Sequence, residues 1–171
     1  MSKHLVLSFI AADQPGLVEK VARIVAAENG NWLESRLAHL AGRFAGIVKI
    51  SVAAANGDAL KSKLQSLASE QFQIIIEDEL PGSSGTNMHQ LQLDIIGSDR
   101  PGIVKEIAQA LSTRDINVDE MASNITSAPM TAEALFEAKV TISIHENANM
   151  DDLQEALDAI ANELTLEVNV N

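Results

Sequence analysis

Alternating apolar and polar positions predict the first strand of each half of the chain. In the second half, Leu91, Leu93 and Ile95 occupy every second position, with polar residues between them. That period of two is typical of a strand with one buried and one exposed face. We therefore expect strands over His4–Ile10 and Met88–Ile96.

Helical spacing follows each of these strands. Leu17 and Val21 in the first half, and Ile103, Ile107 and Leu111 in the second, recur three or four residues apart, which places them on one helix face. Later patterns predict two more strands, a second helix and a closing strand in each half. The expected ranges are 32–40, 44–54, 57–70 and 72–79 in the first half, and 116–126, 134–145, 149–162 and 164–170 in the second.

The two halves repeat one another. The stretch ADQPGLVEKVARIV reappears later in the chain as SDRPGIVKEIAQAL, with Asp13 matching Asp99. Between the copies lies PGSSGTN, whose Pro, Gly and Ser content is typical of a linker. We expect two domains, residues 1–80 and 88–171, joined by a linker at 81–87.

The order of elements within each copy, βαββαβ, predicts the fold. Right-handed β-α-β crossovers interleave into an antiparallel four-stranded sheet that carries both helices on one face. We therefore expect an α+β protein of two ferredoxin-like modules. In the strand at 134–145, the residues expected to face the helices are Phe136, Ala138, Val140, Ile142 and Ile144, and the residues between them are expected to face the other way.

An Asp-x-Pro-Gly sequence lies between the first strand and first helix of each copy. A structural role explains it, because Asp can accept hydrogen bonds at a helix start, Pro fits the first turn, and Gly permits a tight turn. A ligand role uses the same atoms: free N–H groups at a helix start can bind a carboxylate, and the Asp can hold an ammonium group. The pattern leaves both roles open, and its repetition strengthens the second.

A βαββαβ unit with Asp-x-Pro-Gly-Leu/Ile-Val at this place resembles the ACT domain. The resemblance covers nearly the whole chain and implies modules that bind amino acids at interfaces between paired modules. It also implies that the turn and the start of the second strand lie near each other. The ligand-binding residues that it implies are Asp13, Gln14, Pro15, Gly16, Leu17 and Asn31 in the first copy, and Asp99, Arg100, Pro101, Gly102, Ile103 and Asn117 in the second.

Three of these positions keep a structural alternative. Asn31 and Asn117 suit a donor to a ligand carboxylate or a simple turn residue. Arg100 suits an anion partner or a solvated surface charge. The first copy also has a shorter connection with Gly42 and Gly46, so we expect its pocket to differ from the second, or to be empty.

Charge and composition narrow the class of function. The formal net charge is −12, and the basic residues form no cluster, so we expect no direct contact with nucleic acid. There are no cysteines, and no apolar run reaches the length of a membrane-spanning helix. We expect a soluble cytoplasmic protein without membrane contact. Scarce aromatic residues, only 3% of the chain, argue against base stacking on the sheet face.

No set of acid, base and nucleophile stands out, and the histidines have no metal-binding spacing. We therefore expect no enzyme, no metal site and no cofactor. The resemblance implies a regulator that senses a small amino acid, with glycine as the candidate, and represses transcription by contact with a DNA-bound activator protein. A regulatory subunit docked on a metabolic enzyme is the alternative. Exposed edge strands and small cores favour a homodimer.

Overall fold

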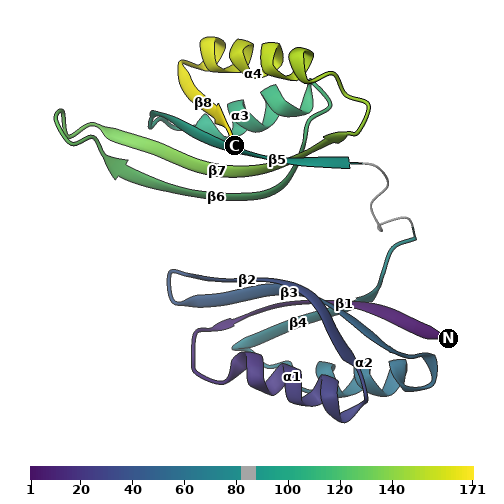
Figure 1. Cartoon of the computed structure of the whole chain (residues 1–171). Coiled ribbons are helices and arrows are strands. Elements are labelled where there is room, and N and C mark those ends of the chain that lie inside the picture. The colour runs from purple at the N-terminus through teal and green to yellow at the C-terminus, as the bar shows by residue number, and fades with distance from the viewer. Residues whose placement is uncertain (82–87) are drawn as a thin grey trace. The chain divides into compact units, whose positions relative to one another are not determined.

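The chain divides into two compact units, Met1–Ser84 and Gly85–Asn171, which we call module 1 and module 2. The structure is a computed structural model that describes residues 1–81 and 88–171. The linker expected at 81–87 therefore lies, apart from Pro81, outside the described residues. Figure 1 shows the helices and strands of both modules.

Module 1 has the predicted βαββαβ order. Its strands pair antiparallel in the order β2-β3-β1-β4, and Figure 1 shows both helices on one face of this sheet. The elements are β1 (Ser2–Ala12), α1 (Leu17–Ala27), β2 (Asn31–Leu40), β3 (Arg43–Ala53), a 3₁₀ turn (Ala54–Asn56), α2 (Gly57–Gln65) and β4 (Phe72–Asp78).

Helix α2 is shorter than the range 57–70 that its spacing predicts, because it ends at Gln65. Ser69 then turns the chain: its hydroxyl accepts the backbone N–H of Phe72 at 3.1 Å, and the two residues form an isolated β-bridge. Side-chain to backbone bonds of this kind compete with a helix for the same backbone groups. The chain thereby enters β4 directly.

Module 2 repeats the arrangement with a longer second helix, of 15 residues against nine in module 1. Its strands pair antiparallel in the order β6-β7-β5-β8, again with both helices on one face (Figure 1). The elements are β5 (Met88–Ser98), α3 (Ile103–Ser112), β6 (Asn117–Ser127), β7 (Ala134–His145), α4 (Met150–Leu164) and β8 (Leu166–Val170). The fold class predicted from the sequence is confirmed.

Each module has its own core between sheet and helices. Leu7 and Leu60 are fully buried in module 1, and Leu93 and Val140 in module 2. The five residues of β7 expected to face the helices are all buried, which confirms that prediction. Within the described residues, no helix combines the length and the apolar character needed to cross a membrane.

Candidate functional site

The Pro-Gly pair forms a turn that ends just before each first helix. Gly16 and Gly102 are the N-cap residues, and both are left-handed, with φ of 89° and 92°. In module 2, the carbonyl of Arg100 accepts the N–H of Ile103 at 3.2 Å, closing a turn with Pro101 and Gly102 at its centre. These are the positions that Pro and Gly prefer in a type II turn.

Two structural expectations about the turn are therefore wrong. The prolines precede the helices, which begin at Leu17 and Ile103, instead of lying in their first turns. No side chain caps either helix within the described part of the chain, so Asp13 and Asp99 are not capping residues. A glycine in the left-handed conformation takes the N-cap position in both modules.

The backbone of each aspartate is tied to the neighbouring hairpin. The N–H of Asp13 donates to the carbonyl of Gly42 at 3.0 Å, between β2 and β3. The N–H of Asp99 donates to the carbonyl of Ala134, the first residue of β7, at 2.9 Å. The Asp13 carboxylate lies 3.5 Å from Nε2 of His39, and both side chains are about half exposed. These bonds fix the turn but leave the Asp13 side chain accessible.

In module 1, the turn and the first turn of α1 line a cavity of about 330 Å³. Four of the residues predicted from the sequence meet there: Asp13, Gln14, Gly16 and Leu17. Sequence reasoning missed the other lining residues, Val18, Glu19 and Phe44. Phe44 belongs to β3 and comes to the turn only through the pairing of β1 with β3, which no local motif reveals.

In module 2, the equivalent turn is occupied by contacts within the module. The guanidinium of Arg100 donates to the Glu106 carboxylate at 2.6 Å and to the Leu164 carbonyl at 3.1 Å. Through these bonds Arg100, whose side chain is 35% exposed, joins the turn to α3 and to the end of α4. Gln14, the counterpart of Arg100, instead lines the cavity of module 1.

The two asparagines do not join the turns within their modules. Asn31 pairs with Ser51, which pairs in turn with His4 near the start of β1, whereas Asp13 follows the end of β1. His4 and Asp13 are nine residues apart in the sequence, and at about 3.3 Å per residue of strand the distance between Asn31 and Asp13 is therefore about 30 Å. The expectation that the turn and the start of the second strand lie near each other is therefore wrong within a module, and the same register separates Asn117 from Asp99.

Asn117 instead belongs to a polar cluster centred on Asp119. A β-bulge lies at this point of β6, between Val118 and Glu120. The Asp119 carboxylate accepts hydrogen bonds from Asn117 at 2.8 Å, Gln90 at 2.9 Å and Ser143 at 2.7 Å. The hydrogen bond from Ser143 to Asp119 explains why Ser143 is buried, although this residue was expected to face away from the helices. The cluster holds β5, β6 and β7 together.

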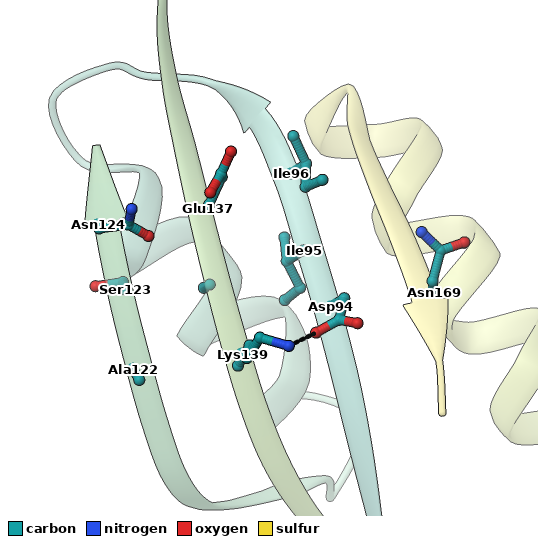
Figure 2. Close-up of a pocket in the computed structure, with 10 residues that line it drawn as sticks. Asp94, Ile95, Ile96, Ala122, Ser123, Asn124, Glu137, Lys139 and Asn169 are labelled. Carbon is teal, nitrogen blue, oxygen red and sulfur yellow. Dashed lines mark ion pairs between the residues drawn. The ribbon is translucent and has the colours of Figure 1, made fainter. Parts of the chain in front are cut away.

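A second cavity, of about 480 Å³, lies on the sheet of module 2 (Figure 2). Its floor is polar and charged: Lys139 lies 3.4 Å from Asp94, and Glu137 accepts a hydrogen bond from Thr126 at 2.9 Å. The lining residues are Asp94, Ile95, Ile96, Ala122, Ser123, Asn124, Glu137, Ala138, Lys139 and Asn169. This open face matches the polar face that the β7 alternation predicts.

Comparisons with known proteins agree with the geometry of both modules. Models of the ACT domain match residues 3–77 and residues 85–162. Together these matches span most of the chain, in the two places where the structure has its modules. The chain belongs to the ACT-domain family, as two ACT domains in tandem.

One curated protein and two solved structures match nearly the whole length of the chain. The glycine cleavage system transcriptional repressor of Escherichia coli (strain K12) is 23% identical over 171 residues, 98% of this chain and 89% of that protein. A crystal structure of an unknown protein from Galdieria sulphuraria has a TM-score of 0.84 at 24% identity, and the match covers all of this chain and 98% of that one. A crystal structure assigned to a glycine cleavage system transcriptional repressor has a TM-score of 0.75 at 21% identity, over all of this chain and 97% of that one. At these identities the structures support the fold alone.

Proposed function

We propose that this protein is a non-catalytic regulator that senses a small amino acid and represses transcription of a glycine cleavage system. Membership of the ACT-domain family and the likeness to a repressor over nearly the whole chain support this role. The protein acts in the cytoplasm, as a homodimer, and contacts a DNA-bound activator protein. A net charge of −12 favours contact with a protein over contact with phosphate.

The observation that carries the proposal is the cavity beside the first turn of module 1. Its wall holds Val18 and Glu19, whose N–H groups belong to the first turn of α1 and have no partner inside the helix. Such N–H groups attract a carboxylate. Asp13 lies on the same wall and suits an ammonium group, whereas Glu19 is paired with Arg23. A zwitterion therefore finds both of its partners in one cavity.

Module 1 is the better sensor of the two. In module 2, Asp99, Pro101, Gly102 and Ile103 repeat the turn, but Arg100 holds it against α3 and α4. Asn31 and Asn117 would reach a bound ligand only from another module, in line with sites at interfaces between paired modules. The side chains on the cavity wall do not distinguish glycine from serine or alanine.

Titration calorimetry on the full chain, with glycine, serine and alanine in turn, tests the proposal. We expect binding of at least one of them, weakened about 10–100-fold by Asp13→Asn, because a hydrogen bond to a charged group is worth about 1.5–3 kcal/mol. The matched variant Asp99→Asn should bind like the unchanged protein. If no amino acid binds at millimolar concentration, the sensing role fails.

The partner is tested separately by affinity purification of the chain from cells. Recovery of a transcription activator, in an amount that changes when the bound amino acid is added, supports the repressor role. Recovery of a metabolic enzyme instead would support a regulatory subunit. In either case an electrophoretic mobility-shift titration should show no tight, sequence-specific DNA binding by this chain alone.

A further inference from the structure

The open face of the module 1 sheet, which is the face away from α1 and α2, is aliphatic. Ile10, Ile47 and Ile75 are 42%, 56% and 62% exposed. The strand register places them on one face: Ser8 pairs with both Ile47 and Ile75, and Ile10 lies two residues further along β1. We call this surface the aliphatic face; its residues are Val6, Ser8, Ile10, Ala45, Ile47 and Ile75.

The same positions of module 2 carry charged and polar side chains. Asp94 pairs with Lys139 and Asn169, as Ser8 pairs with Ile47 and Ile75. Glu137 stands where module 1 has Ala45. Figure 2 shows Asp94, Lys139, Glu137 and Asn169 on this open face. The same fold thus accepts either an aliphatic or a charged open sheet face. Folding alone therefore does not require the isoleucines on the open face of module 1.

Charge makes the aliphatic face suited to a second copy of itself. Although the chain has a net charge of −12, the charges around this face nearly balance. The residues concerned are Arg36, Arg43 and Lys49 on the positive side, and Glu34, Glu77 and Glu79 on the negative side. The open face of module 2 carries mostly carboxylates and would repel its own copy; its charged residues are Asp94, Glu120, Glu137, Glu167 and Lys139.

Size and shape point the same way. The whole open face of the sheet, with the aliphatic face at its centre, has four strands of seven to eleven residues. At about 4.8 Å between strands and about 3.4 Å per residue it presents about 640 Å², close to the ~800 Å² that each partner buries in a standard interface. Consider a twofold axis that lies between the two sheets, runs parallel to the strands and passes midway between β1 and β3. It would set Ile47 of one copy opposite Ser8 of the other. It would also set Ile10 opposite Ala45. In these two pairs a large side chain would meet a small one, which suits sheets packed face to face.

We propose that the aliphatic face is a homodimer interface, in which two copies of the chain pack module 1 against module 1, sheet on sheet. This interface is separate from the cavity beside Asp13 and does not depend on amino-acid sensing.

The test replaces two isoleucines with the residues that module 2 carries at the same positions, in the double variant Ile47→Lys/Ile75→Asn. Because Lys139 and Asn169 fit the same fold, we expect this variant to fold, which circular dichroism checks. Val104→Lys, which replaces an exposed apolar residue on α3, is the matched control.

Sedimentation equilibrium over a range of concentrations measures the mass, with 18.3 kDa expected for one copy. The unchanged chain and Val104→Lys should dimerise alike, and the double variant should raise the dimer dissociation constant about 100-fold or more, because it places charge in the interface centre. The proposal is overturned if the unchanged chain stays monomeric at high micromolar concentration, which would leave this face to another partner. It is overturned equally if the double variant dimerises as tightly as the unchanged chain.

Discussion

At the scale of single residues, two glycines determine where the first helix of each module begins. Gly16 and Gly102 adopt φ near 90°, a conformation that other residues rarely enter. Each also accepts the first hydrogen bond of its helix, from Lys20 at 2.9 Å and from Glu106 at 3.0 Å. The turn before the helix therefore depends on backbone freedom and not on a capping side chain.

Gly102→Ala isolates this backbone effect. No atom lies within 4 Å of the place where its new Cβ would stand, so no clash contributes. We expect the free energy of unfolding to fall by about 1–2 kcal/mol, the cost of a left-handed conformation with a side chain. Urea denaturation measures it. Gly102→Asn is the control and should lose less, because Asn tolerates this conformation; equal losses would contradict the explanation.

Residue identities in the turn were predictable, but their partners were not. The motif alone indicated Asp13 and Gly16 beside a ligand site, and both line the cavity. Phe44 and His39 approach the turn through strand pairing, and Arg100 finds its partners on α3 and α4. Contacts between residues far apart in sequence depend on register, which hydrophobic spacing does not specify.

At the scale of elements, a charged cluster ties three parts of module 1 together. The carboxylate of Asp78, the last residue of β4, lies 2.9 Å from the amine of Lys61 on α2 and 3.0 Å from that of Lys3 on β1. Hydrogen bonds from Lys61 and then Lys3 lower the pKa of Asp78. The hydrogen bond to Asp78 in turn raises the pKa of Lys3.

The lowered pKa of Asp78 predicts a pH dependence of stability. Because the folded-state pKa lies below the unfolded one, the stabilising contribution is complete above the unfolded value, about 4. It is lost as the pH falls through the folded value. We therefore expect Asp78→Asn to lower the urea midpoint at pH 6 but to match the unchanged protein at pH 2.

Asp58→Asn is the control for this comparison. The Asp58 side chain is 97% exposed and lies 4.0 Å from Lys3, so removing its charge should change the urea midpoint little at either pH. A gap between Asp78→Asn and the unchanged protein that persists at pH 2 would show that packing, not protonation, separates them.

Periodicity predicted the elements better than it predicted their surroundings. In the part of the chain that the structure describes, eight strands and four α-helices lie where the pattern predicts them, apart from the early end of α2 at Gln65. The prediction that failed was the closeness of each turn to the start of the second strand. The direction of the strands places Asn31 and Asn117 at the far end of the sheet from the turns. Periodicity also gave no sign that Glu79, just after β4, is only 17% exposed and accepts hydrogen bonds from His4 and Lys49.

At the scale of the whole molecule, one fold serves two different surfaces. The repeat preserved the turn, the bulge in the second strand and the helix-facing core. It did not preserve the open sheet faces, aliphatic in module 1 and charged in module 2. Duplication followed by divergence on the faces that folding leaves open would allow one module to hold a partner that the other module does not hold.

Separate cores also predict separate stabilities. Leu7 and Leu93 are equivalent residues, each fully buried and each confined to the core of its own module. Replacing a buried Leu with Ala costs about 2–5 kcal/mol. In hydrogen exchange on the full chain, Leu7→Ala should lower the opening free energy of the β1 and β3 amides by that amount and leave β5 and β7 within about 0.5 kcal/mol of their original values.

Leu93→Ala is the reciprocal control and should do the opposite. Equal losses in both modules from either variant would mean that the two cores unfold as one cooperative unit, and that amino-acid binding in module 1 stabilises module 2 as well.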